Sequence, residues 1–399
     1  MKEMDALIRR GVEVHFFSNV FKDDSEFDGI KCFGRIPGIR GKLIAAVTLI
    51  KYPCFFIPRL LRNWREAVRI AIIESAVMAR VQKYQIDIIH THFLWPQGEC
   101  CELASRSNKV PLVATLRGAE LRDEPDLGYG SMRDPWFRKN FESSKKTIAY
   151  FTAPNSGLRR ALIREHGVEP DRVCLLPNGV ERIDLPLPLR TVSTHLKMVV
   201  VGNFVKVKNH GWLLETLSAL SASGWELDIY GNGPEQFALE AIVLKNNLWN
   251  VRICGVQPKL RLMEIIRDAD VLVHPSTMEG MPNVVLESMA MGTPVVVSNI
   301  DAHRDIVTDG YNGYFFDLNS PSSLRALVRS FIQQPSRLSR LSPNCLATAK
   351  DYALDVKIDG YLKLYDNLTR SAYQAVNRGW SRDSLFQRSS TDTPRTRRQ

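Results

Sequence analysis

The chain has 399 residues, of which 44% are hydrophobic and 24% charged, an ordinary composition for a globular protein that excludes a disordered or fibrous chain. This length predicts two domains, or three, with sizeable cores. The net charge of +10 is concentrated in two places. Residues 31–80 carry ten Lys or Arg against two Glu, and residues 370–399 carry seven Arg against two Asp.

The basic segment 31–80 also contains apolar stretches, a pattern that fits a surface resting on anionic lipid headgroups and equally fits a solvated surface helix. No nucleic-acid recognition motif accompanies the charge, so we expect no nucleic-acid partner. No apolar run reaches the roughly 18–20 residues of a spanning helix, and the first residues lack a secretory signal. Seven scattered cysteines without Cys-x-x-Cys favour the reducing cytoplasm, with association at the inner face of the membrane left open.

The chain opens with a helical stretch, residues 1–10, that ends at Gly11. Short apolar runs then alternate with longer helical stretches. The runs are residues 12–17, 86–90, 111–115, 173–176, 198–201, 226–230, 251–254, 271–274, 294–297 and 314–316. This alternation predicts an α/β fold with two doubly wound, Rossmann-like domains that face a cleft. In such sheets ligands bind beyond the carboxyl ends of the strands.

Two prolines without periodicity in residues 184–190 indicate a linker between the two sets of strands. The predicted organisation is a first domain 1–185, a linker 186–195, a second domain 196–355, a helix 356–370 that crosses back to the first domain, and a disordered basic tail 371–399.

The most informative segment is residues 279–297. A predicted strand, residues 270–275, leads into a short loop and then into a helix that starts near Pro282. Backbone amides at this helix start, together with the helix dipole, form a site for a phosphate. The amides concerned are those of Gly280, Met281 and Asn283. A pyrophosphate bound there leaves Glu279 and Glu287 to accept hydrogen bonds from sugar hydroxyls on either side.

The string Glu-x7-Glu, with Gly-x-Pro-Asn inside it and Ser-Met-Ala-x-Gly-x-Pro-Val-Val after it, resembles the family 4 glycosyltransferases, which are retaining enzymes of the GT-B fold. The resemblance implies that Glu279 faces the donor sugar, that Glu287 holds the ribose, and that the amides between them bind the diphosphate. Segment 199–210 resembles the loop after the first strand of the family's nucleotide domain, in which Lys208 neutralises the departing diphosphate. Asn203 stands in that loop where many members carry arginine.

Three further segments resemble family loops. Gly231 and Gly233 form the turn after the second strand of the nucleotide domain, on the donor side. Residues 305–313 match a later turn, with aspartate at a position that is usually glutamate. Residues 177–180, Pro-Asn-Gly-Val, end the first domain and are structural in this interpretation.

In the first domain, His90 and His92 alternate on one strand, but without a third ligand they do not indicate a metal site. The resemblance implies that His92 hydrogen-bonds the donor sugar from the opposite domain. His90, Arg117 and Gly118 fall on the acceptor side of the cleft. The Asp268-x-Asp270 pattern precedes a strand and is interpreted as structural, so we expect neither a metal nor another cofactor.

The resemblance extends to about residue 370 but lacks the first strand and the glycine-rich loop that precede the first helix in the family. This gap predicts either a start codon assigned too late, which we favour because the predicted site residues are intact, or a degenerate protein.

We predict a hexosyltransferase that uses a UDP- or GDP-linked sugar and transfers it with retention to a hydroxyl of a glycan or lipid-linked acceptor, in surface polysaccharide or glycolipid synthesis. Glu279, Lys208 and His92 are the predicted catalytic residues. Two alternatives stay open: a nucleotide-sugar epimerase on the same fold, and a catalytically impaired nucleotide-binding or scaffold protein.

Overall fold

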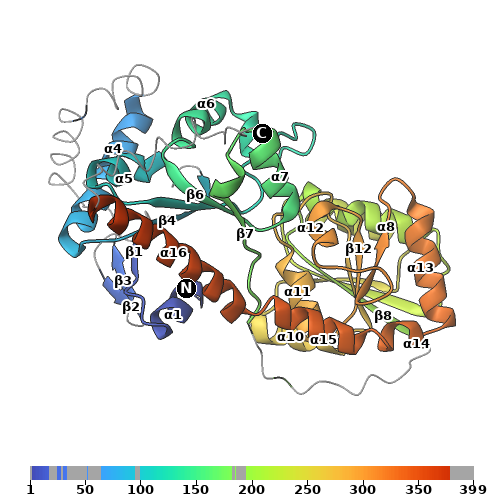
Figure 1. Cartoon of the computed structure of the whole chain (residues 1–399). Helices are drawn as coiled ribbons and strands as arrows, with labels where there is room; N and C mark the ends of the chain where they lie inside the picture. Colours follow the sequence, from blue (N-terminus) through green and yellow to red (C-terminus); the bar gives the residue numbers. More distant parts are fainter. Residues whose placement is uncertain are drawn as a thin grey trace, which may run out of the picture.

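The computed structural model describes residues 2–17, 25–27, 30–33, 52, 64–94, 99–181, 185 and 195–377. Figure 1 shows two α/β domains beside each other, each built on its own parallel sheet, with the N-terminal domain on the left. The predicted fold class is therefore confirmed. Most of the basic segment 31–80, nearly all of the predicted linker and the end of the predicted tail lie outside the described residues.

The C-terminal domain contains a six-stranded sheet in the order β10-β9-β8-β11-β12-β13, in which all neighbouring strands are parallel. The strands are β8 (Leu196–Val201), β9 (Trp225–Tyr230), β10 (Val251–Gly255), β11 (Val271–His274), β12 (Val295–Ser298) and β13 (Gly313–Phe316). The helices of this domain are α8 (His210–Ser218), α9 (Gln236–Lys245), α10 (Lys259–Asp268), α11 (Asn283–Ala290), α12 (Asp301–Arg304), α13 (Pro321–Gln333), α14 (Ser336–Ser339) and α15 (Ser342–Asp351), with a 3-10 turn η5 (Lys206–Lys208). The central strands are apolar on both faces because helices cover both, and Val199, Leu272 and Val296 are buried.

The N-terminal domain contains a four-stranded parallel sheet in the order β4-β5-β6-β7. Its strands are β4 (Ile89–His92), β5 (Leu112–Thr115), β6 (Ile148–Ala153) and β7 (Val173–Leu175). Its helices are α1 (Lys2–Arg9), α4 (Trp64–Tyr84), α5 (Glu102–Asn108), α6 (Pro135–Ser144) and α7 (Ser156–Arg164), with 3-10 turns η2 (Glu99–Cys101), η3 (Ser131–Arg133) and η4 (Pro170–Arg172). A separate three-stranded sheet holds β1 (His15–Phe17), β3 (Ile30–Phe33) and β2 (Ser25–Phe27). Among the described residues β4 is an edge strand, and the missing first strand stays a prediction.

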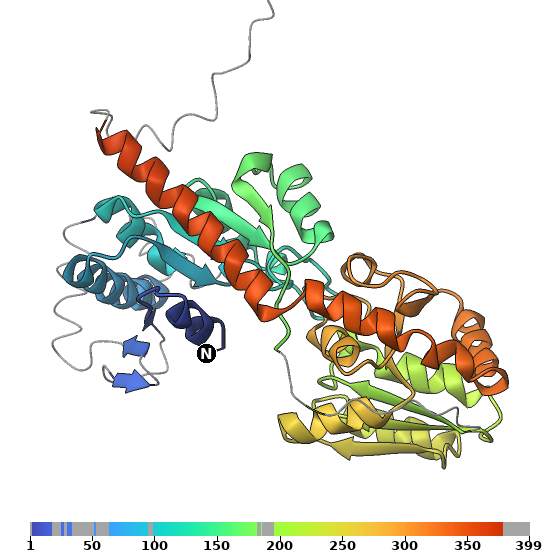
Figure 2. The same cartoon turned by 60° about the horizontal axis from the view of Figure 1, so that its bottom comes forward.

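The long helix α16 (Leu354–Asn377) leaves the C-terminal domain and runs across the N-terminal one, as Figure 2 shows. The predicted crossing helix was shorter, residues 356–370, and α16 continues seven residues into the predicted tail. Ile358 and Tyr361 of α16 pack against Leu7 of α1 and against Leu176. The last helix of the chain therefore completes the core of the first domain.

The two places where the backbone crosses between the domains are hydrogen-bonded to each other. The amide of Val180 donates to Tyr352 O at 2.8 Å, and the amide of Leu354 donates to Val180 O at 2.9 Å. A Cβ at Gly179 would lie 2.6 Å from Leu354 Cα, so this close approach requires glycine. Both crossings thus form one hinge.

Candidate active site

The C-terminal sheet has a topological switch point between its neighbouring strands β8 and β11, because the strand order runs outward from these two in opposite directions. In an open parallel sheet such a point leaves a crevice beyond the carboxyl ends of the strands, where ligands bind. The connection after β8 carries Lys208 and the loop after β11 carries Glu279. Two predicted catalytic residues, 71 positions apart, therefore meet at this crevice.

Glu279 is nearly buried, and three donors converge on its Oε1 atom. Lys208 Nζ forms an ion pair with this oxygen, Ser276 Oγ donates to it at 2.7 Å, and His274 Nε2 lies 2.8 Å away. Burial raises the pKa of a carboxyl, but the hydrogen bond from His274 and the Lys208 ammonium outweigh burial and hold the pKa of Glu279 well below its usual range. Glu279 is therefore anionic, and its Oε2 has no hydrogen-bond donor among the described residues.

His274 and Ser276 are site residues that the sequence analysis missed. His274 is the last residue of β11 and is 2% exposed. Burial lowers the pKa of His274 more than Glu279 raises it, so the imidazole is neutral and its Nε2 proton points to the carboxylate. The available signal was a histidine at the end of a strand, five residues before the predicted carboxylate.

The loop between Glu279 and α11 presents backbone N–H groups to the crevice. Those of Gly280, Met281 and Val284 have no acceptor among the described residues. The N–H of Asn283, which the sequence predicts to be available, donates to Met281 O at 3.0 Å in this structure. Its side-chain Oδ1 instead accepts a hydrogen bond from Asn178 at 2.9 Å. The amides at this helix start that could donate to an anion are therefore those of Gly280, Met281 and Val284, of which the first two residues are buried.

Glu287 lies one turn into α11, where the resemblance places the ribose of a nucleotide. Its Oε1 forms an ion pair with Lys259, the first residue of α10, which the sequence analysis did not single out. The Lys259 side chain is 44% exposed, and an exposed pair of this kind contributes only about 0–1 kcal/mol. A ribose hydroxyl could therefore replace the ammonium at little cost.

The glycines after β9 serve close packing between two loops. A Cβ at Gly231 would lie 1.9 Å from Gly202 O, and one at Gly233 would lie 2.5 Å from Phe204 O. Both glycines have φ values above +140°, which L side chains rarely adopt. They hold the loops after β8 and β9 against each other, next to the exposed Asn203.

The two histidines of β4 have different surroundings. Both ring nitrogens of His90 are engaged inside the domain, with Tyr365 OH at 2.5 Å and Thr115 Oγ1 at 2.7 Å. His90 therefore connects α16 to the sheet, and neither of its nitrogens is left to bind an acceptor substrate. His92 is 38% exposed, and its Nδ1 accepts a hydrogen bond from Arg117 Nη2 at 2.6 Å. Burial, followed by the Arg117 charge, lowers the pKa of His92 to about 4. His92 is therefore neutral and carries its proton on Nε2.

The loop after β5 brings Arg117 and Gly118 to the boundary between the domains. The buried Glu120 carboxylate shapes this loop, because it accepts hydrogen bonds from the amides of Arg117 at 2.9 Å and Gly118 at 2.7 Å. A Cβ at Gly118 would lie 2.6 Å from Gly280 Cα. The predicted acceptor-side loop and the predicted phosphate loop are thus in direct backbone contact.

Behind this loop lies an ion pair that the sequence did not indicate. Lys357 of α16 has a side chain that is 2% exposed, and its Nζ contacts Glu3 Oε1 at 2.6 Å. The other oxygen of Glu3 lies 3.6 Å from Arg117 Nη2 and 3.8 Å from His92 Nε2. Helices from both ends of the chain therefore support the Arg117–His92 pair.

The Asp268-x-Asp270 pattern has structural contacts, since Asp268 pairs with Arg267 and Asp270 Oδ2 accepts from the Lys197 amide at 2.8 Å. In the described ranges there is no group of three or more His, Cys, Asp or Glu residues that could hold a metal ion. None of the helices that the structure describes is both long and apolar enough to span a bilayer.

Residues 3–182 match the family described as Glycosyltransferase Family 4, and residues 188–346 match the family described as Glycosyl transferases group 1. The D-inositol 3-phosphate glycosyltransferase of Acidothermus cellulolyticus is 27% identical over 401 residues, which cover 94% of this chain and 86% of that protein.

Solved structures show the same fold. Sucrose-phosphate synthase from Thermosynechococcus elongatus is similar with a TM-score of 0.72 at 18% identity, over 93% of this chain and 92% of that one. HepE from Anabaena, in complex with UDP and glucose, has a TM-score of 0.59 at 17% identity, over 73% and 81%. The two family matches leave only residues 183–187 uncovered between residues 3 and 346. Together with the structural likeness they show that the chain belongs to the glycosyltransferases of the family 4 type and has the GT-B fold.

Proposed function

We propose that the chain transfers a hexosyl unit from a UDP- or GDP-linked sugar, with retention, to a hydroxyl of a glycan or lipid-linked acceptor in surface polysaccharide or glycolipid synthesis. The observation that carries this proposal is the meeting of Glu279, Lys208 and open backbone amides at the switch point of the C-terminal sheet. HepE, a fold neighbour, is described with UDP and glucose, which supports a nucleotide-sugar donor.

In this proposal the diphosphate binds the amides at the start of α11, and Lys208 moves from Glu279 to a phosphate oxygen. The ribose replaces Lys259 at Glu287. Oε2 of Glu279 then accepts a hydrogen bond from the sugar, while Oε1 stays fixed by His274. Because Arg117 occupies Nδ1, the Nε2 proton of His92, 3.8 Å from Glu3 Oε2, is the one that turns to the sugar from the opposite domain.

During transfer the bond between the anomeric carbon and the diphosphate oxygen breaks, and its electron pair stays on that oxygen. Lys208 and the dipole of α11 stabilise the growing negative charge. The acceptor hydroxyl bonds the anomeric carbon on the same face, and its proton passes to the leaving phosphate. We propose that these fixed positive groups suffice without a divalent cation, and that contact between the domains excludes water.

The test incubates the chain with α-linked UDP- and GDP-hexoses and candidate glycan and lipid-linked acceptors, with and without EDTA. Nucleotide release and the anomeric proton coupling of the product are measured. A new α-glycosidic bond formed equally well in EDTA supports the proposal. An inverted product, a free epimerised sugar without acceptor, or nucleotide-induced thermal stabilisation without any turnover contradicts it.

A further inference from the structure

Asn178 makes side-chain hydrogen bonds to both domains. Its Oδ1 accepts from Arg117 Nη1 and from Lys357 Nζ, each at 3.1 Å. Its Nδ2 donates to Asn283 Oδ1 at 2.9 Å. One amide group therefore connects a loop of the N-terminal domain, the crossing helix α16 and the first residue of α11.

Asn178 lies in the chain next to the hinge between the domains. Asn178 directly precedes Gly179 and Val180, the residues that pair with the second crossing at the hinge. Asn178 thus lies at the point where the chain passes from one domain to the other. It is therefore placed to hold Asn283 of one domain and Arg117 of the other in a fixed relation.

The bonds of Asn178 continue on both sides. Asn283 begins the helix whose open amides face the proposed diphosphate site, and Arg117 donates through Nη2 to His92 Nδ1 at 2.6 Å. A continuous chain of side-chain hydrogen bonds thus runs from the start of α11 through Asn178 and Arg117 to His92.

We propose that Asn178 is a positioning residue that sets the orientation of His92 toward the donor sugar when the diphosphate is bound at α11. This inference rests on the proposed function and assigns a part of it to a residue that the sequence analysis interpreted as structural. Asn178 does not touch the reacting atoms and acts through Arg117.

The chemistry of this position selects asparagine. The two cationic groups on one side require an acceptor, and Asn283 Oδ1 on the other side requires a donor. An amide supplies both in one planar group, whereas a carboxylate is an acceptor only. Aspartate would place a second negative oxygen against Asn283 Oδ1, close to the proposed diphosphate.

The test compares Asn178→Ala, Asn178→Asp, Asn283→Ala and the double variant Asn178→Ala/Asn283→Ala with the wild-type chain. The matched control is Asn319→Ala, at an exposed position in the loop before α13. For each variant, kcat, the KM for the donor and the Kd for UDP or GDP alone are measured, together with the thermal unfolding midpoint.

We expect kcat to fall about tenfold in both Asn178 variants while the nucleotide Kd changes less than threefold, since the amides of α11 are unaltered. The double variant should lose no more than the worse single variant, because both substitutions break one chain of bonds. Equal losses in kcat and nucleotide binding, additive losses in the double variant, or unchanged kcat in Asn178→Ala would each overturn the proposal.

Asn283→Ala keeps the test decisive if an Asn178 variant fails to fold, because Asn283 is exposed and lies away from the hinge pairing. Unchanged kcat in Asn283→Ala then counts against the inference. A wild-type chain that transfers no sugar contradicts the proposed function, and an active wild type with an unaffected variant contradicts only the role of Asn178.

Discussion

Glu279 keeps its negative charge although its side chain is only 10% exposed. A buried carboxylate is stable only when hydrogen bonds and charges replace the water that it has lost. Here His274, Ser276 and Lys208 replace that water on one oxygen alone. This one-sided arrangement fixes the carboxylate and leaves its second oxygen for a ligand.

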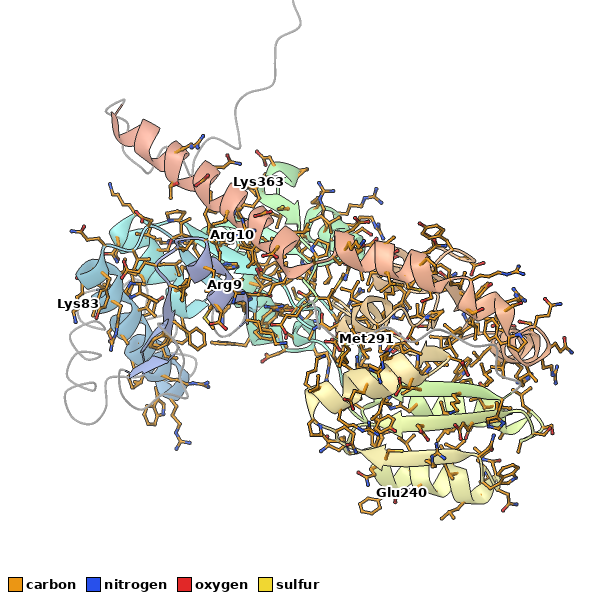
Figure 3. The ribbon with its side chains drawn as sticks, turned by 90° about the horizontal axis from the view of Figure 1, so that it is seen from below. Arg9, Arg10, Lys83, Glu240, Met291 and Lys363 are labelled. Carbon is orange, nitrogen blue, oxygen red and sulfur yellow. The ribbon has the colours of Figure 1, made fainter. Side chains whose placement is uncertain are left out.

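We expect Glu279→Gln to lower kcat about a hundredfold, because an amide cannot provide the charge that faces the sugar. Nucleotide binding should change much less, since the amides of α11 are unaffected. The matched control is Glu240→Gln on α9, which Figure 3 shows at the far edge of the C-terminal domain. Steady-state kinetics with a UDP- or GDP-hexose check this expectation, and wild-type turnover in Glu279→Gln would refute the assigned role.

His274→Phe tests whether the low pKa of Glu279 depends on the hydrogen bond from His274. The bond lowers the pKa of Glu279, so its loss raises that pKa and moves the acidic limb of the kcat profile to higher pH. His274→Gln, whose amide can still donate, should restore part of the wild-type profile. The measurement is kcat from pH 3 to pH 8, a range that includes the acidic limb, and an unshifted limb in the phenylalanine variant would contradict the role of His274.

At the scale of elements, the contact between the loop after β5 and the loop before α11 depends on two glycines. A Cβ at Gly280 would lie 1.8 Å from Arg117 O, a distance that the two backbones cannot accommodate without moving apart. On the opposite loop, a Cβ at Gly118 would lie 2.6 Å from Gly280 Cα. The separation of the domains at the proposed site is thus set by the absence of side chains.

We expect Gly280→Ala to force these loops apart and to lower kcat about a hundredfold through misplacement of His92 relative to the donor. Small-angle scattering should show a larger radius of gyration. Gly211→Ala in α8 is the control, because its Cβ meets only Ile242 Cδ1 at an ordinary 3.4 Å. Unchanged kcat and radius in Gly280→Ala would show that the contact does not control closure.

Most strands of the two large sheets could be predicted from the sequence, because buried parallel strands are continuous apolar runs bounded by polar loops. Glu279 and Lys208 could be placed on neighbouring loops for the same reason. Strand β6 was not among the predicted runs, although it lies inside the N-terminal sheet. The residues that contact the site from elsewhere could not be predicted in this way. Lys259, Asn178 and Lys357 reach it only after distant segments have folded together. The engaged amide of Asn283 also depends on a local turn that residue types do not specify.

At the scale of the whole molecule, three histidines of the C-terminal domain are buried and uncharged. His210, His274 and His303 are at most 4% exposed, and burial lowers the pKa of each, to about 3 for His210 and His303. The unfolded chain binds protons at these residues near pH 6.5, whereas the folded chain does not. The folded state gains free energy of unfolding from keeping these histidines neutral, and this contribution is lost as the pH falls below 6.5.

We expect the free energy of unfolding of the C-terminal domain to decrease by up to about 1.4 kcal/mol per pH unit for each of these histidines below pH 6.5. Urea unfolding between pH 7.5 and pH 5 measures this slope. A triple variant with His210, His274 and His303 replaced by Gln should have a shallower slope. A free energy that is constant over this range would show that the histidines are protonated in the folded chain.

The path of α16 also determines the order in which the domains can be completed during synthesis. Residues 195–351 contain every strand and helix of the C-terminal domain, so this domain can fold as soon as that stretch has left the ribosome. Leu7 and Leu176 receive their partners Ile358 and Tyr361 only afterwards. The domain that is translated first is therefore the one that finishes folding last, and a nascent chain arrested before residue 354 leaves this part of its core open to solvent and to chaperones.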